Sequence, residues 1–158
     1  GDVYKRQVQI LHVLGPKNIR GATRITDELT GASWLPMGYV DDMASAYAAA
    51  DLMVARSGAG TVVETATVGL PTIYVPLPHG NGEQARNATS AVDAGAGVVV
   101  ANADLDVERL LAETARIHDA DVLAQMSAAG RGLMPAHAAE EMAVRVISAA
   151  TSIDPTIG

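Results

Sequence analysis

Residues 52–88 constrain this chain more than any other stretch of its sequence. They run from an apolar segment through a loop of small residues into a helix pattern, and then through a second apolar segment and a proline-bounded loop into a polar helix start. This order is typical of a nucleotide-diphosphate site on an α/β sheet. A glycine-rich turn lets phosphate oxygens approach the backbone, and the free N–H groups and positive dipole end of the next helix attract them.

The composition fits one folded domain and argues against nucleic-acid binding and membrane insertion. The chain has 158 residues, 49% of them hydrophobic, which is enough for a packed core. Cysteine is absent, which excludes disulfides and cysteine nucleophiles. A net charge of −7 without a basic run argues against a nucleic-acid partner. No apolar stretch approaches the roughly 20 residues of a transmembrane helix, so we expect no direct membrane insertion by this segment.

The two ends of the chain stand apart from the expected domain, which we place at residues 8–151. The chain has no initiator Met, and residues 1–7 run almost directly into an apolar segment. Two interpretations stay open: a fragment whose first seven residues are foreign to the fold, or a processed or tagged chain. Residues 152–158 are expected to form a loose tail.

Apolar, β-branched segments alternate with helix patterns along the chain. Strands are expected at residues 8–14, 37–40, 52–56, 72–75 and 98–101. Helices are expected at residues 18–30, 43–50, 61–69, 83–94, 104–118, 119–129 and 136–150. This alternation predicts the α/β class, with a Rossmann-like doubly wound parallel sheet. Ligands of such sheets bind beyond the carboxyl ends of the strands, so the loops at 40–42, 57–60 and 76–83 are expected to share one edge.

The small-residue loop Ser57–Thr61 allows two interpretations. It can bind a diphosphate through its backbone, with the Thr61 hydroxyl adding a hydrogen bond, or it can be a tight strand-to-helix turn that needs glycine only for geometry. The dinucleotide-binding motif does not fit, because Val63 stands where its third glycine belongs and Gln84 where its acidic residue belongs. A P-loop is absent, since no Gly-Lys-Ser/Thr follows.

Glu64 also allows two interpretations. The spacing Thr61-x-x-Glu64 fits a capping box, in which the carboxylate reaches back to the start of the helix. Alternatively, the two carboxylate oxygens match the vicinal hydroxyls of a ribose. Spacing alone leaves both open.

Three polar residues begin the helix expected after the proline-bounded loop: Glu83, Gln84 and Asn87. Gln84 and Asn87 are three residues apart and share a helix face. Amides both donate and accept hydrogen bonds, which suits sugar hydroxyls, although an ordinary polar helix start has the same composition. No histidine pair has the helical spacing of metal ligands, so we predict no metal site. Ser57 lacks an identifiable histidine partner, which argues against a serine hydrolase.

Taken together, these residues resemble the donor-binding domain of the MurG family. Members of this family make lipid II by transferring N-acetylglucosamine from UDP-GlcNAc to lipid I. The resemblance runs from about Val8 to Ile147 and is densest in residues 37–88. The family's run Arg-Ser-Gly-Ala-x-Thr-x-x-Glu stands here at residues 56–64, its Gly-Leu-Pro at residues 69–71 and its Gln-x-x-Asn-Ala at residues 84–88.

The resemblance implies the C-terminal half of a GT-B glycosyltransferase that inverts the anomeric centre without a metal or cofactor. Glu64 would bind the ribose, the helix start the diphosphate, Val40 the uracil through its backbone, and Gln84 the sugar hydroxyls. The implied UDP-GlcNAc site comprises Val40, Ser57, Gly58, Ala59, Gly60, Thr61, Val62, Val63, Glu64, Glu83, Gln84 and Asn87. It includes no catalytic residue. The whole enzyme would be cytoplasmic and peripheral at the inner face of the plasma membrane, acting in peptidoglycan synthesis.

The chain departs from the family pattern in three respects. Glu83 replaces the glutamine common in some members, which leaves its role open. The Gly-Gly-Ser-x-Gly-type loop that begins this domain in the family is absent, and so is the acceptor-binding N-terminal domain. Two alternatives remain: another nucleotide-sugar transferase or epimerase of the same superfamily, or a non-catalytic donor-binding subunit that needs a partner chain.

Overall fold

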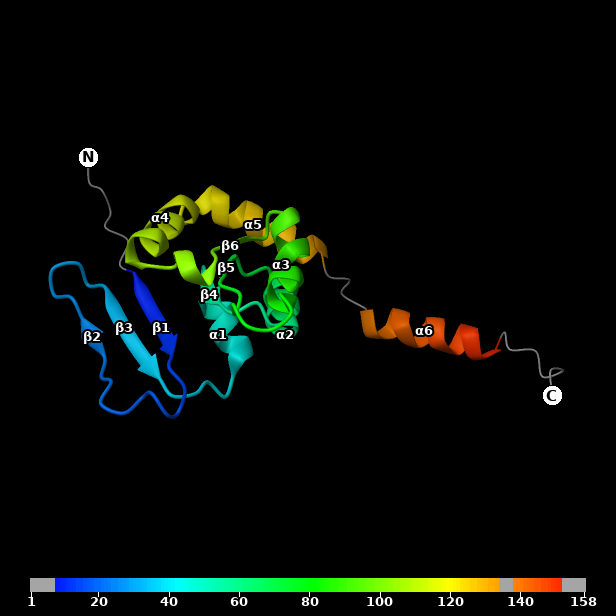
Figure 1. The fold of residues 1–158 in the computed structure, drawn as a ribbon, viewed down its shortest axis with the longest axis horizontal. Helices are drawn as coiled ribbons and strands as arrows, with labels where there is room; N and C mark the ends of the chain where they lie inside the picture. Colours follow the sequence, from blue (N-terminus) through cyan, green and yellow to red (C-terminus); the bar gives the residue numbers. More distant parts are fainter. Residues whose placement is uncertain (1–7, 134–137, 152–158) are drawn as a thin grey trace. The chain divides into compact units, whose positions relative to one another are not determined.

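The computed structural model describes residues 8–133 and 138–151, so the leader and tail expected at residues 1–7 and 152–158 lie outside the described residues (Figure 1). The chain divides into two compact units, Gly1–Ala46 and Tyr47–Gly158. The boundary falls inside α1 (Met43–Ala49).

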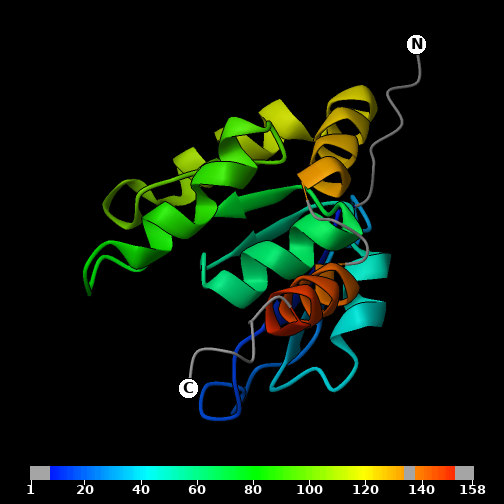
Figure 2. The same cartoon turned by 90° about the vertical axis from the view of Figure 1, so that its right-hand side faces the viewer.

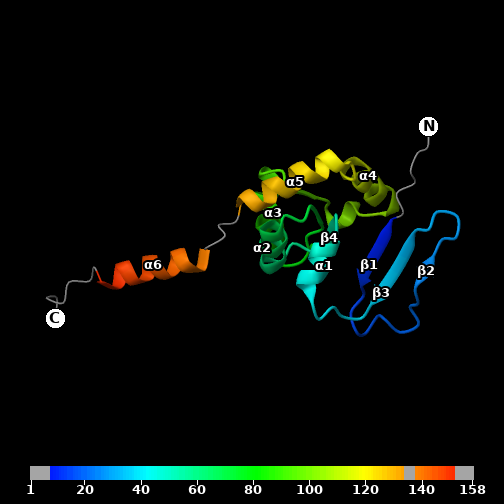
Figure 3. The same cartoon turned by 180° about the vertical axis from the view of Figure 1, so that it is seen from behind.

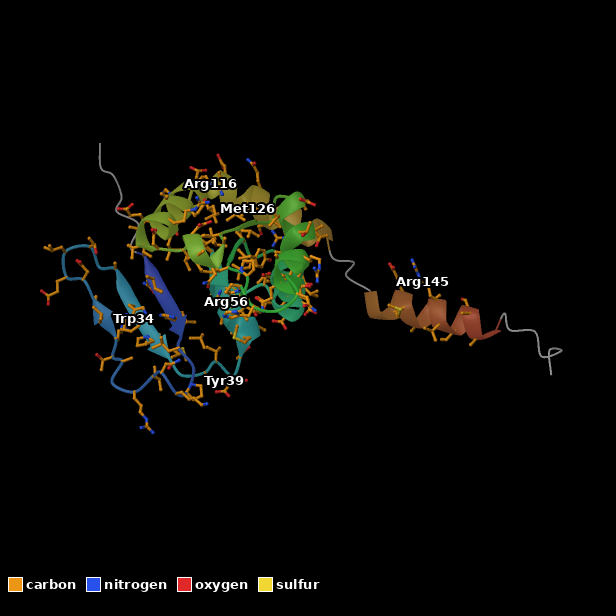
Figure 4. All side chains as sticks on the ribbon, viewed as in Figure 1. Trp34, Tyr39, Arg56, Arg116, Met126 and Arg145 are labelled. Atoms are coloured by element: carbon orange, nitrogen blue, oxygen red, sulfur yellow. The ribbon has the colours of Figure 1, made fainter. Side chains whose placement is uncertain are left out.

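The first unit is built on a three-stranded sheet with the order β1-β3-β2. The strands are β1 (Gln9–Val13), β2 (Ile25–Thr26) and β3 (Ser33–Met37). β3 pairs with β1 in parallel and with β2 in antiparallel orientation. Trp34, labelled in Figure 4, donates its indole N–H to Nδ1 of His12 at 3.3 Å, which links the side chains of β3 and β1.

The helix predicted at residues 18–30 is wrong, because this segment consists of turns and the short strand β2. The carboxylate of Asp27 accepts hydrogen bonds from the amides of Leu29 and Thr30, both at 2.9 Å. Asp side chains compete in this way with helical hydrogen bonds. Gly31 has a positive φ of 69° at the turn into β3.

The strand predicted at residues 37–40 lies earlier in the chain, because β3 spans Ser33–Met37. The sequence disfavours a strand over residues 33–37 because it contains Pro36, and proline has no N–H to donate to a sheet. Here it is tolerated because alternate amides of β3 face β1, beginning with Ser33, which donates to the carbonyl of Val8 at 3.0 Å. Pro36 faces the other side, where β2 pairs only with Ser33 and Trp34.

The second unit contains the parallel sheet β4-β5-β6 (Figures 1 and 3). Its strands are β4 (Met53–Ala55), β5 (Thr72–Tyr74) and β6 (Gly97–Val99). The described helices are α2 (Ala59–Val68), α3 (Glu83–Asp93), α4 (Val107–Ile117), α5 (Ala120–Leu133) and α6 (Ala138–Thr151), with a 3-10 turn at Asn102–Asp104. The predicted order of elements from residue 43 onward is therefore confirmed, with ends shifted by a few residues.

Helices cover both faces of this sheet, as a doubly wound fold requires (Figure 2). The side chain of Tyr74 on β5 packs with Val62 of α2 and with Ala88 and Ala91 of α3. Its neighbours Ile73 and Val75 point to the opposite face, where Ile117 of α4 and Met126 of α5 cover them. The predicted fold class is confirmed, and β5 is the buried centre of the unit.

Gly97 is required by the packing of Tyr74. A Cβ added at Gly97 would lie 2.6 Å from Cε2 of Tyr74 and 2.7 Å from the carbonyl oxygen of Thr72. The Tyr74 hydroxyl also lies 2.8 Å from Oγ1 of Thr65 on α2, which holds the ring in place. The ring cannot move aside without losing this buried hydrogen bond.

We expect Gly97→Ala to destabilise the protein by about 1–3 kcal/mol, because the added methyl group overpacks the core. Gly132→Ala is a matched control, since a Cβ there meets nothing within 4 Å and alanine favours the helix. Chemical denaturation of the two variants measures the difference. Equal stability of the two variants would contradict the packing account.

Candidate functional site

The carboxyl ends of β4 and β5 carry the polar residues that the sequence singles out in this unit. The chain leaves β4 through Arg56, Ser57 and Gly58 and enters α2, and it leaves β5 through residues 75–82 and enters α3. Because the strands are parallel, both loops lie at the same edge of the sheet. The predicted common edge is confirmed for these two loops, whereas the loop at residues 40–42 lies in the first unit and its place at this edge stays a prediction.

The N-terminus of α2 has free backbone donors. Gly58 caps the helix in an extended conformation without any side-chain hydrogen bond. The amide of Val62 makes the first helical bond, to the carbonyl of Gly58 at 3.0 Å. The amides of Ala59, Gly60 and Thr61 therefore have no acceptor within the described residues. Three convergent N–H groups at a helix start form an anion-binding arrangement.

Two hydroxyl groups flank this helix start. Oγ of Ser57 is fully buried and has no hydrogen-bond partner in the part of the chain that the structure describes. A buried polar atom without a partner is costly, which points to a group that the site is built to receive. Oγ1 of Thr61 lies 3.9 Å from the position that a Cβ of Gly58 would occupy. The missing side chain of Gly58 thus leaves this hydroxyl open.

Val62 and Val63 contribute less to the helix start than the sequence suggests. Val62 is 3% exposed and packs in the core, and its amide is already bonded to Gly58. The difference arises because α2 begins at Ala59 rather than at the predicted Thr61. The free donors therefore lie two residues earlier than expected, and Val63 is a partly exposed residue of the second turn.

Glu64 does not form a capping box, because Thr61 is inside α2 and Gly58 is the cap. Its Oε2 instead accepts a hydrogen bond from the hydroxyl of Tyr47 on α1 at 2.8 Å. Its Oε1 lies 3.9 Å from the position that a Cβ of Gly60 would occupy. The side chain therefore runs back toward the helix start, and the carboxylate lies in the same region as the free donors.

The pKa of Tyr47 is raised to about 12. Burial of the phenol is the largest cause, followed by the hydrogen bond to Glu64 and the negative charge of that carboxylate. The phenol is therefore protonated throughout the physiological pH range, and it donates its proton to Glu64.

The amides of Gln84 and Asn87 are oriented by backbone contacts. The backbone N–H of Leu77 donates to Oε1 of Gln84 at 3.0 Å, and Nδ2 of Asn87 donates to the carbonyl of Ser57 at 3.1 Å. An N–H cannot accept and a carbonyl cannot donate, so both amide orientations are fixed. Gln84 is left with a free NH₂ donor and Asn87 with a free carbonyl acceptor. Glu83, the first residue of α3, is exposed.

Arg56 ties the carboxyl ends of the strands together. Its Nη1 donates to the carbonyl of Val75 at 3.0 Å and to Oδ1 of Asn102 at 2.7 Å. These contacts join the segments that follow β4, β5 and β6, and they place a positive charge at this edge. Arg56 is labelled in Figure 4.

Val40, the remaining predicted site residue, belongs to the first unit and is 9% exposed. It precedes α1, whose N-terminus is capped by Asp42 through the amide of Ser45 at 3.0 Å. The hydrogen bonds from Ser45 lower the pKa of Asp42. The cap of α1 is therefore Asp42.

Sequence reasoning assigned no role to Tyr47 or Arg56. Tyr47 is the single aromatic residue in an alanine-rich helix, and its partner Glu64 is 17 positions away, so no local pattern connects them. Arg56 stands directly between an apolar strand and the small-residue loop. A long cation at that point is the signal that would have identified it.

A cavity of 230 Å³ lies at the opposite edge of the sheet and is lined in part by Asp51, Pro71 and Ser127. It has few convergent polar groups, so the open edge at α2 and α3 is the better candidate site. Over residues 8–133 and 138–151, no group of three His, Asp or Glu side chains is arranged to hold a metal ion. No described helix is long and apolar enough to cross a membrane.

Two solved structures share the fold of this chain, and in each case the match covers less than half of the solved chain. The crystal structure of Acinetobacter baumannii MurG has a TM-score of 0.79 and 26% identity, and the match covers 90% of this chain and 42% of that one. The glycotransferase of kitacinnamycin has a TM-score of 0.66 and 22% identity over 89% of this chain and 34% of that one, a likeness of fold alone.

Curated relatives agree with the structural match. A Nocardioides protein is 44% identical over 137 residues, covering 86% of this chain and 37% of the relative. A Mycobacterium ulcerans protein is 47% identical over 139 residues, covering 86% and 35%. Both are named UDP-N-acetylglucosamine–N-acetylmuramyl-(pentapeptide) pyrophosphoryl-undecaprenol N-acetylglucosamine transferase. The chain thus spans little more than a third of the length of these relatives.

A family description also matches most of the chain. Residues 2–143 match the glycosyltransferase family 28 C-terminal domain. This range includes both loops of the candidate site and the starts of α2 and α3. The chain therefore belongs to glycosyltransferase family 28 and corresponds to its C-terminal domain.

Proposed function

We propose that this chain is the donor-binding part of an enzyme that transfers N-acetylglucosamine from UDP-GlcNAc to lipid I, giving lipid II in peptidoglycan synthesis. The observation that carries the proposal is the start of α2, where three free amides and the unpartnered Ser57 hydroxyl lie close to the carboxylate of Glu64. A nucleoside diphosphate offers the anion and the diol that these groups accept. The names of the relatives supply the identities of donor and acceptor.

The diphosphate is assigned to the amides of Ala59, Gly60 and Thr61, with the hydroxyls of Ser57 and Thr61 as further donors. Gly58 and Gly60 carry no side chain to obstruct it. The charge of Arg56 at the same edge adds a favourable field for an anion. The ribose hydroxyls are assigned to Glu64, and the uracil to the backbone of Val40.

The sugar is assigned to the start of α3. The free NH₂ of Gln84 donates to one sugar hydroxyl oxygen, and the free carbonyl of Asn87 accepts from another. A fixed donor and a fixed acceptor on one helix face suit a pair of hydroxyls. Glu83 is placed near the sugar but is assigned no contact with it.

The proposed transfer is a direct displacement with inversion. The acceptor hydroxyl attacks C1 of the sugar, the bond from C1 to the diphosphate oxygen breaks, and UDP leaves with an added negative charge. The helix dipole and the amides of α2 stabilise that charge without a metal ion. The acceptor, and the base that removes its proton, are assigned to the part of the relatives that this chain does not cover. We place the whole enzyme at the inner face of the plasma membrane as a peripheral protein.

Titration of the purified chain with UDP-GlcNAc, UDP-GalNAc, UDP and NAD, followed by amide NMR, tests the proposal. We expect shifts at Gly58–Glu64 and Gln84, with UDP-GlcNAc preferred and no response to NAD. Preference for another nucleotide sugar would indicate a different transferase or an epimerase. A dispersed spectrum without any response would contradict donor binding by this chain.

We expect Glu64→Ala to weaken UDP binding by about tenfold or more, because a hydrogen bond to a charged group is lost. The free energy of unfolding should change by less than about 0.5 kcal/mol, since the side chain is exposed and alanine favours a helix. Calorimetric titration and thermal denaturation measure the two quantities. Asp93→Ala removes the same charge at the far end of α3 and should leave UDP affinity unchanged.

Gln84→Glu tests the sugar contact. The substitution keeps an oxygen for the amide of Leu77 but replaces the free NH₂ donor with a second oxygen. We expect the ratio of UDP-GlcNAc affinity to UDP affinity to fall by about tenfold, since a donor to the sugar is lost. Gln125→Glu on α5, an exposed position, controls for the added charge. An unchanged affinity ratio in Gln84→Glu would show that Gln84 does not contact the sugar.

A further inference from the structure

The carboxylate of Glu64 is held by a residue from another helix. The side chain is exposed and has three rotatable bonds, so without a partner it would sample many orientations. Its Oε2 accepts the hydroxyl hydrogen of Tyr47 at 2.8 Å, which selects one of them. In that orientation Oε1 lies toward Gly60, one turn closer to the helix start.

The hydroxyl of Tyr47 is well placed to hold Glu64 in this orientation. The ring of Tyr47 is half-buried, so part of the side chain is shielded from solvent. Burial and the neighbouring carboxylate raise the pKa of Tyr47 to about 12, so the hydroxyl keeps its proton at neutral pH. The hydroxyl can therefore donate to Glu64 throughout the pH range in which a nucleotide would bind.

The contact also leaves the acceptor capacity of Glu64 largely free. A carboxylate has about four lone-pair sites, and Tyr47 occupies one of them on Oε2. Oε1 has no partner within the described residues, and the absence of a side chain at Gly60 keeps its surroundings open. One oxygen is thus anchored and the other presented to the helix start.

We propose that Tyr47 is a positioning residue for nucleotide recognition, whose hydroxyl holds the Glu64 carboxylate in the orientation that receives the ribose diol. This inference rests on the proposed function, because it assigns Tyr47 to the ribose subsite of the same site. A plain structural tie between α1 and α2 is the competing explanation. The two differ in whether the effect of Tyr47 depends on the ribose hydroxyls.

Tyr47→Phe removes the hydroxyl and keeps the ring. In calorimetric titrations of the 158-residue chain at pH 7, we expect UDP affinity to fall by about three- to tenfold, since the carboxylate is no longer oriented. Affinity for 2′-deoxy-UDP, which lacks one hydroxyl of the diol, should change by less than about twofold. The preference for ribose over deoxyribose should therefore shrink in the variant.

A double variant shows whether Tyr47 acts through Glu64. Tyr47→Phe combined with Glu64→Ala should bind UDP no more weakly than Glu64→Ala alone, because coupled residues are not additive. Additive losses would overturn the proposal. Equal losses for UDP and 2′-deoxy-UDP in Tyr47→Phe, with a lower denaturation temperature, would establish the structural tie instead.

The failure of this inference is distinguishable from the failure of the proposed function. If the wild-type chain binds UDP with a preference over 2′-deoxy-UDP and Tyr47→Phe behaves identically, only the role of Tyr47 is overturned. If the wild-type chain does not bind UDP, donor binding fails and the inference fails with it.

Discussion

Burial of β5 between two helical layers is the constraint on which the second unit depends. Ile73, Tyr74 and Val75 are 0%, 1% and 3% exposed, and they alternate between the two hydrophobic clusters. A strand buried on both faces must have all its backbone groups paired, and β4 and β6 provide this pairing. The positions of α2 and α3 relative to the sheet follow from the same packing, since both contact Tyr74.

The polar edge is cross-linked by hydrogen bonds between its loops. Arg56 joins the ends of three strands, Asn87 holds the carbonyl of Ser57, and the amide of Leu77 holds Gln84. Each of these contacts uses one part of a side chain and leaves another part unpaired. The fold thus fixes the direction of the remaining donors and acceptors before any ligand arrives, which reduces the ordering cost of binding.

The sequence predicted the second unit better than the first. Alternation of apolar segments and helices located each element after residue 43, because glycine and proline mark most of their ends. The helix predicted at residues 18–30 is wrong because the side chain of Asp27 forms local turns, which a weak helical pattern does not reveal. In the candidate site, the sequence places the start of α2 at Thr61, since Ala59 and Gly60 resemble a loop, whereas the helix begins at Ala59. The contact of Tyr47 with Glu64 depends on tertiary packing and leaves no trace in local spacing.

The free donors at the start of α2 belong to the main chain, and this has an evolutionary consequence. No substitution except one to proline removes a backbone N–H. Binding of an anion by backbone amides would therefore survive most changes of sequence. In the proposed site, recognition by the side chains of Glu64, Gln84 and Asn87 would have no such protection. Anchoring and selectivity would then reside in chemically separate parts of the same edge, so selectivity could change between related proteins while anchoring persists.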